Sequence, residues 1–247
     1  MNAQPIVVYG VNSPNVLKVV IMLEELGLPY TLQHVAVFNG EQFKPEFLRL
    51  NPLGKVPVIV DPKLGQPIAE SGAILIYLAE QYGAFLPQKP DARYDVLQWL
   101  MIQVASMGPM LGQFTHFSLL PADTESYARG RYAAMAKKLY TLVNDHVTER
   151  EWIAGGAYSI ADMAIFPWAE YSERHGYTGQ DFPAMKKWRE VIAQRPAVMR
   201  ARSRMHESFT DISQKTIQAA TSDDLDRFFG RTQEMPQTDY GAVKRMR

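Results

Sequence analysis

Hydrophobic positions in the first 86 residues follow two different periods, which predicts a domain with both strands and helices. Apolar residues between 16 and 26 recur at the spacing of one helix face, whereas the runs at 6–9 and 30–37 are typical of strands. The expected elements that follow are a short helix over 44–50, a strand over 55–61 and a helix over 71–80. With a turn expected at 64–67 after the strand at 55–61, the order βαβ…ββα indicates an α/β domain with a small mixed sheet and helices against it.

The pattern changes after residue 86. Two prolines and few β-branched residues indicate a linker over 87–92, and strand signals are not found beyond it. Helices are expected over 95–104, 127–147, 159–174 and 183–195. The predicted organisation is therefore an α/β domain over 1–86, an all-helical domain over 93–207 and a C-terminal extension over 208–247.

Composition narrows the classes of function. Lys plus Arg and Asp plus Glu both number 26, so the chain lacks the basic excess that broad binding to nucleic acid or to an anionic membrane requires. The chain has no cysteine, which excludes disulfides, a protein thiol nucleophile and Cys-ligated metals. The five histidines show no metal-binding spacing, and no signal peptide or long apolar span is evident. We therefore expect a cytoplasmic protein without a metal.

The turn VNSPN, after the first predicted strand, has two interpretations. A helix N-terminus stabilises anions, and there Ser13 can donate a hydroxyl proton and Asn15 its amide protons. The same residues make a good helix cap, because Ser is a preferred cap and Pro14 suits the first helical position.

Another motif has a structural interpretation and no chemistry is assigned to it. Ser159 and Asp162 fit the capping box of a helix start.

Two further stretches could bind a ligand. If the Val56–Pro57 bond is cis, the backbone of Val56 is free for an extended peptide ligand, although most X-Pro bonds are trans. At the start of the next helix, Glu70 could hold an ammonium group and Ser71 a carboxylate, or the pair could simply cap the helix. The residues alone leave both interpretations open.

In this order the motifs resemble the glutathione transferase superfamily over about residues 5–207. The segments that carry the resemblance are NPLGKVPVIVD, ESGAILIYLAE and YSIADMAIFPW. The turn Ser13-Pro14-Asn15, the run GEQFKPEFL at 40–48 and GPMLGQ at 108–113 are similar to the bacterial Nu class in particular.

The resemblance implies a thioredoxin-like N-terminal domain followed by a helical glutathione-transferase domain, assembled as a homodimer. It implies a cis bond before Pro57 and a glutathione, or glutathione disulfide, in the site. The residues that match glutathione-binding positions are Asn15, Gln42, Lys55, Val56, Pro57, Glu70 and Ser71. Ser13, Asn15 and Arg131 match positions that act on the thiol, although Arg131 could equally be a solvated helix arginine.

The expected activity is reduction of disulfide bonds through a stabilised glutathione thiolate. Because the chain has no cysteine, both reacting sulfurs must come from substrates, a small thiol or disulfide. Thioether cleavage and conjugation of an electrophile are alternatives within the same chemistry. A glutathione-binding or regulatory protein without turnover is the alternative from another class.

Overall fold

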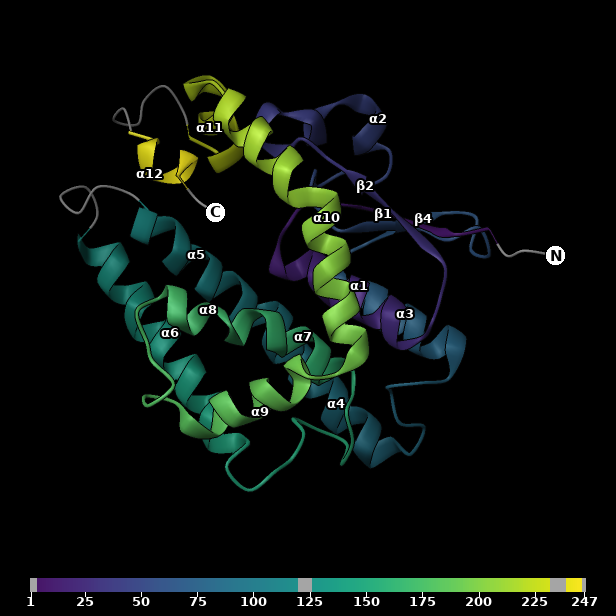
Figure 1. Ribbon diagram of the computed structural model, residues 1–247. Coiled ribbons are helices and arrows are strands. Elements are labelled where there is room, and N and C mark those ends of the chain that lie inside the picture. Colours follow the sequence, from purple (N-terminus) through teal and green to yellow (C-terminus); the bar gives the residue numbers. More distant parts are fainter. Residues whose placement is uncertain (1–3, 120–125, 232–238, 246–247) are drawn as a thin grey trace. The chain divides into compact units, whose positions relative to one another are not determined.

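The structure, a computed structural model, describes residues 4–119, 126–231 and 239–245, and these form two compact units (Figure 1). One unit comprises residues 1–74 together with 200–247, and the other comprises residues 75–199. The first contains a small mixed sheet, and the described part of the second contains helices and no strand, which confirms the predicted fold class. The domain boundaries expected at 86, 92 and 207 stay predictions.

The sheet of the first unit has four strands in the order β2-β1-β3-β4. Their bounds are β1 (Ile6–Gly10), β2 (Tyr30–His34), β3 (Val58–Val60) and β4 (Pro67–Ala69). β1 pairs with β2 in parallel, and the other two pairings are antiparallel. β3 begins one residue after Pro57, in agreement with a residue that cannot donate a ladder hydrogen bond.

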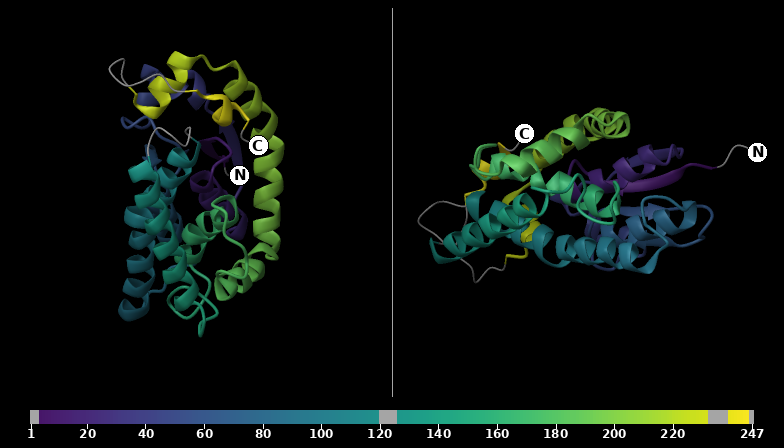
Figure 2. Two further views of the ribbon diagram at one scale, coloured as in Figure 1. Left: turned by 90° about the vertical axis from the view of Figure 1, so that its left-hand side faces the viewer. Right: turned by 90° about the horizontal axis from the view of Figure 1, so that it is seen from below.

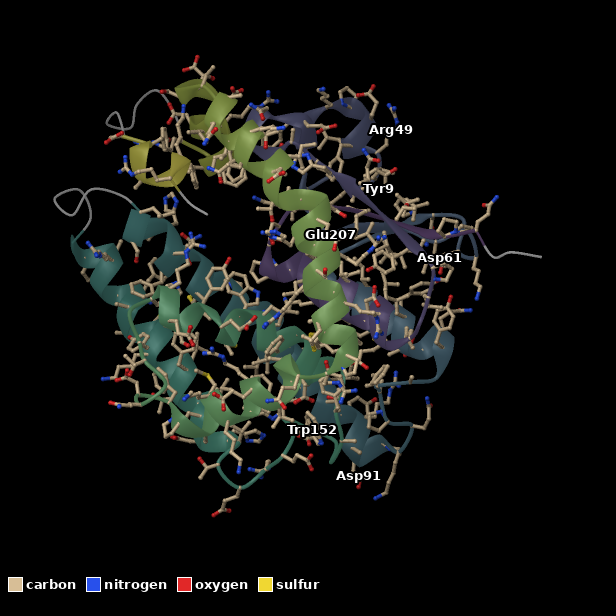
Figure 3. All side chains as sticks on the ribbon, in the orientation of Figure 1. Tyr9, Arg49, Asp61, Asp91, Trp152 and Glu207 are labelled. Carbon is tan, nitrogen blue, oxygen red and sulfur yellow. The ribbon has the colours of Figure 1, made fainter. Side chains whose placement is uncertain are left out.

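Short helical segments surround this sheet. They are α1 (Pro14–Glu25), η1 (Val37–Asn39), η2 (Glu41–Phe43), α2 (Pro45–Leu48) and α3 (Ser71–Tyr82), which continues into the second unit. The predicted apolar stripe of α1 is buried, as at Val16, Val19 and Leu23, because it forms part of the core. Asp61, labelled in Figure 3, is also buried; its carboxylate accepts the Lys63 N–H at 2.9 Å in the turn after β3.

The C-terminal segment also belongs to the first unit. It contains α11 (Ser222–Phe229), α12 (Gly241–Lys244) and, from Arg200 onward, α10 (Pro196–Ala219), the long light-green helix in Figures 1 and 2. Arg200 of α10 donates to the Glu24 carboxylate at 2.7 Å, and the Phe209 ring packs 6.0 Å from that of His34. The sequence pattern predicted no helix beyond residue 195. It missed α10 because that helix is mostly polar and buries a narrow stripe.

Helices and no strand are found in the described residues of the second unit, 75–119 and 126–199. They are α4 (Pro90–Ile102), η3 (Gln103–Met107), α5 (Gly108–Leu119), α6 (Ser126–His146), α7 (Ile160–Ala169), α8 (Tyr171–Arg174) and α9 (Pro183–Ala193). The predicted capping box at Ser159 and Asp162 is confirmed. The Asp162 carboxylate also accepts the Ile153 N–H at 2.9 Å and the Trp188 indole N–H at 3.0 Å, so one buried side chain joins three segments.

Candidate functional site

Three of the candidate stretches meet at one end of the sheet. The register pairs Tyr9 of β1 with Val58 of β3, and Val58 with Ala69 of β4. Because both pairings are antiparallel, the residues just after Tyr9, just before Val58 and just after Ala69 lie side by side. The turn at 11–15, the pair at 56–57 and the helix start at 70–71 are therefore neighbours. The sheet brings together what the sequence separates by about 60 residues.

The turn at the end of β1 is shaped by Gly10. A Cβ added there would lie 2.7 Å from Val16 Cγ1, so only glycine lets the strand end pack against the first turn of α1. Ser13 is the cap of α1, and its Oγ accepts the Val16 N–H at 3.4 Å. The capping interpretation is thus confirmed, yet this long bond uses only a lone pair of Ser13. The hydroxyl proton can still be donated to an anion. Asn15, half-buried, lies in the first turn of α1 beside it.

The loop before β3 presents the backbone of Val56. The Val56–Pro57 peptide bond is cis, as the resemblance implied. The buried Asn51 holds this loop, since its amide donates to the Lys55 carbonyl at 2.8 Å and accepts the Leu53 N–H at 3.0 Å. Val56 itself is half-buried, and the Lys55 side chain is exposed. This loop therefore presents a backbone edge held by hydrogen bonds, with the solvent-exposed Lys55 ammonium near it.

Glu70 and Ser71 form the start of α3 in an unusual conformation. Glu70 has φ 69°, which is the left-handed region that a non-glycine residue seldom adopts. Such strain is found where the surrounding structure requires a particular side-chain direction. The Glu70 side chain is exposed, whereas Ser71, the first residue of α3, is buried.

Lys18 of α1 is a residue of this site that the sequence analysis missed. It is 1% exposed, and its ammonium nitrogen lies 3.3 Å from Ser71 Oγ. Burial lowers the pKa of the Lys18 ammonium from 10.5 to about 7, and the charge of Glu70 opposes that decrease. Because Ser71 accepts from Lys18, its hydroxyl proton remains available to a ligand carboxylate. The available signal was a lysine inside the otherwise apolar helix VLKVVIML.

Gln42 lies in η2, on the segment that follows β2. It is 3% exposed, and its Oε1 has no hydrogen-bond partner among the described residues. The segment is held in place by Glu41, whose carboxylate accepts the Ala36 N–H at 2.6 Å. A buried acceptor without a partner is costly, so Gln42 is a candidate for contact with a ligand.

An apolar cluster lies behind the site. Its buried members are Val35, Val37, Phe47 and Val58. The half-buried residues packed against it include Val11 and Val56, which border the candidate turns. Tyr9, labelled in Figure 3, lies in β1 and packs edge-on against Phe47 at 6.3 Å.

Arg131 belongs to the second unit, whereas the other candidate residues belong to the first. It is an exposed residue of α6 in the helical unit. Its action at the thiol stays a prediction.

In residues 4–119, 126–231 and 239–245, no three His, Asp or Glu side chains are grouped so that they could hold a metal ion. None of the helices in these ranges is both long and apolar enough to cross a membrane.

The sequence matches the models of two protein domains of one family. Residues 12–81 match the glutathione S-transferase N-terminal domain, and residues 109–196 match the glutathione S-transferase C-terminal domain. Among individual proteins, the chain is 42% identical over 198 residues to the disulfide-bond oxidoreductase YfcG of Escherichia coli. That alignment covers 78% of this chain and 92% of the relative.

Solved structures are similar as well. A glutathione transferase of Pseudomonas putida, with one glutathione disulfide bound per subunit, is 39% identical with a TM-score of 0.74. The match covers 80% of this chain and 90% of that one. A family member from Pseudomonas fluorescens, with two glutathione molecules bound, is 41% identical with a TM-score of 0.73. It covers 80% of this chain and 92% of that one.

Proposed function

The chain belongs to the glutathione S-transferase family, and on this premise we propose that it binds glutathione or glutathione disulfide and reduces disulfide bonds with a stabilised glutathione thiolate. The observation that carries the proposal is the register of β1, β3 and β4, which groups three stretches of hydrogen-bonding groups at one end of the sheet. The relative named as a disulfide-bond oxidoreductase and the neighbour with bound glutathione disulfide support it.

Glutathione is proposed to lie along the grouped residues as an extended peptide. The backbone N–H and C=O of Val56, beside Pro57, bind the cysteinyl part. Ser71 donates to the γ-glutamyl carboxylate, and the exposed Glu70 carboxylate binds the ammonium group. The glycyl end then lies toward Gln42 and Lys55.

The turn at Ser13 would hold the sulfur as an anion. A thiol with a pKa of about 8.5 is only a few per cent thiolate at neutral pH. Lowering that pKa by about two units takes roughly 2.7 kcal/mol of preferential stabilisation of the anion. Hydrogen bonds from Ser13 and Asn15, about 1.5–3 kcal/mol each, together with the N-terminus of α1, are sufficient. Neither side chain is a base near pH 7, so their role is to stabilise the thiolate, with Arg131 as a third donor.

The reaction proceeds by thiol–disulfide exchange. The glutathione thiolate attacks one sulfur of a substrate disulfide, forms a mixed disulfide and releases the other sulfur as a thiolate. A second glutathione then attacks the mixed disulfide, so glutathione disulfide and a second thiol leave. The chain contributes no sulfur, because it has no cysteine. We also propose that the protein is a homodimer of the Nu class, on the similarity of its turn at 13–15 and its run at 40–48.

Two variants of Ser13 test the thiolate role. Ser13→Ala removes both the helix cap and the hydroxyl donor. Ser13→Asp keeps a good cap but replaces the donor with a negative charge. Both are expected to lower kcat with glutathione and hydroxyethyl disulfide at least 10-fold, with a much smaller change in glutathione affinity. If the aspartate variant turned over at the wild-type rate, capping would be the residue's only role.

Turnover measured with three kinds of substrate distinguishes the remaining candidate functions. Turnover of a chlorinated aromatic, without turnover of hydroxyethyl disulfide, would favour conjugation. Release of glutathione from a thioether would favour thioether cleavage. Tight glutathione binding without turnover of any of the three would contradict the enzymatic proposal and favour a binding or regulatory protein.

A further inference from the structure

We propose that Arg227 of α11 binds the glycyl carboxylate of glutathione, so that the C-terminal segment completes the glutathione site. The proposal rests on the proposed function, which directs the glycyl end toward Gln42 and Lys55. It goes beyond that function because the second of the two family matches ends at residue 196, and α11 lies after it in the sequence.

The helix that carries Arg227 has well-defined ends. Thr221 and Asp224 form a capping box at its start, and Gly230 ends it in the left-handed conformation with φ 68°. Leu225 is fully buried and anchors the helix to the first unit. A short helix with both ends satisfied and an apolar anchor can hold a side chain in a fixed place.

α11 packs on the segment that carries Gln42, beside the site. The Phe228 ring lies 4.7 Å from that of Phe38 in η1. Phe228 also packs against the apolar cluster behind the site, as do Val11 and Val56. Figures 1 and 2 show α11, in yellow-green, next to the dark-blue segment that contains η1. The C-terminal segment therefore shares its packing with the candidate binding loops.

Arg227 lies close to residues that come before and after Gln42 in the sequence. Its guanidinium carbon lies 4.6 Å from the centre of the Phe43 ring, and its Nη1 lies 3.7 Å from the ideal Cβ position of Gly40. A cation over an aromatic face is attracted by the ring, so this contact helps to hold the Arg227 side chain beside η2. Because residues 40 and 43 flank Gln42, the cation lies beside the proposed glycyl end.

Arg227 forms no close ion pair with a carboxylate among the described residues. Its charge helps to lower the pKa of the Asp224 carboxyl on the same helix, whose oxygens accept hydrogen bonds from Thr221. The side chain is exposed. Gln42 gives a second, independent observation, because its buried Oε1 also lacks a partner among the described residues. A buried acceptor and an exposed guanidinium without a close ion pair among the described residues match a peptide end that offers an N–H and a carboxylate.

The test compares two ligands and two proteins by isothermal titration calorimetry. The ligands are glutathione and its glycyl ethyl ester, which lacks the glycyl negative charge. The proteins are the wild type and Arg227→Ala. If Arg227 reads that carboxylate, the substitution weakens glutathione binding about 10-fold, the size expected for one charge-assisted bond, and ester binding less than about 2-fold. Arg227→Lys is expected to recover part of the loss, because it keeps the charge but not the planar fork.

Each other outcome contradicts the proposal in a distinct way. Equal weakening of both ligands by Arg227→Ala would assign Arg227 a structural role only. No weakening of either would remove it from the site. Lys215→Ala removes an exposed cation from α10 of the same segment and is the matched control, with wild-type affinity expected for both ligands. A wild-type protein that binds neither ligand would instead contradict the proposed function itself.

Discussion

Replacing the buried Lys18 with methionine should stabilise the protein, and the gain should depend on pH. Folding places the Lys18 ammonium in a fully buried position, which lowers its pKa from 10.5 to about 7. The difference between those two values corresponds to about 5 kcal/mol at 1.36 kcal/mol per pKa unit. Methionine has a similar length and no charge, so it avoids this cost.

The direction of the pH dependence follows from proton binding. The folded-state pKa is below the unfolded one, so between about pH 7 and 10.5 the unfolded chain binds more protons. The stability of the wild type therefore rises with pH across this window, while Lys18→Met lacks that slope. The gain from the substitution should be about 5 kcal/mol at pH 6 and about 2 kcal/mol at pH 9. Loss of the bond to Ser71 lowers both values by a constant amount of about 1 kcal/mol.

The assay is urea unfolding at pH 6, 7, 8 and 9, followed by far-ultraviolet circular dichroism and by hydrogen exchange of the β1 amides. Tryptophan fluorescence would not report on this unit, because all four tryptophans lie between residues 99 and 188. Lys215→Met, at an exposed site, controls for the change in net charge. An identical stability difference at pH 6 and pH 9 would refute the reasoning, since Lys18 would then keep its proton on folding.

Two further predictions concern single buried positions. Asp162→Ala should lower the free energy of unfolding of the helical unit by about 3–5 kcal/mol, because it leaves several buried N–H donors without an acceptor. Urea unfolding followed by tryptophan fluorescence measures this change. A loss below about 1 kcal/mol would contradict the role of this carboxylate. Gly10→Ala should cost about 1–3 kcal/mol and slow turnover, because the added Cβ would meet Val16 at 2.7 Å and displace the turn that carries Ser13. Gly130→Ala, where a Cβ meets nothing within 4 Å, is its control, and equal kcat values for both variants would disprove the positional argument.

Local features of this protein could be predicted from local patterns. The cap at Ser13, the capping box at Ser159 and the alternation of strand and helix depend on residues a few positions apart, so their signals are contained in short windows. The helix predicted over 159–174 is instead two, α7 and α8, divided at Glu170. Sequence periodicity did not indicate this break, although Pro167 lies inside α7.

The candidate site illustrates the limit of such windows. Ser13, Val56 and Ser71 were selected from the order of motifs and a family resemblance, because nothing local says that they meet. Their convergence depends on which strands pair and in what register, and that is decided by the burial of the whole sheet.

Tertiary structure alone decided the roles of Lys18 and Arg227. A lysine within an apolar helix can extend to solvent or be buried, and its neighbours determine which. Arg227 lies in a short helix whose apolar side includes Leu225 and Phe228, and that pattern does not say which segment the helix packs against. The sequence by itself determined the fold class and the chemistry available in each loop. Only long-range packing decided that α11 lies against the loop of Gln42, because contacts across about 180 residues leave no period in the chain.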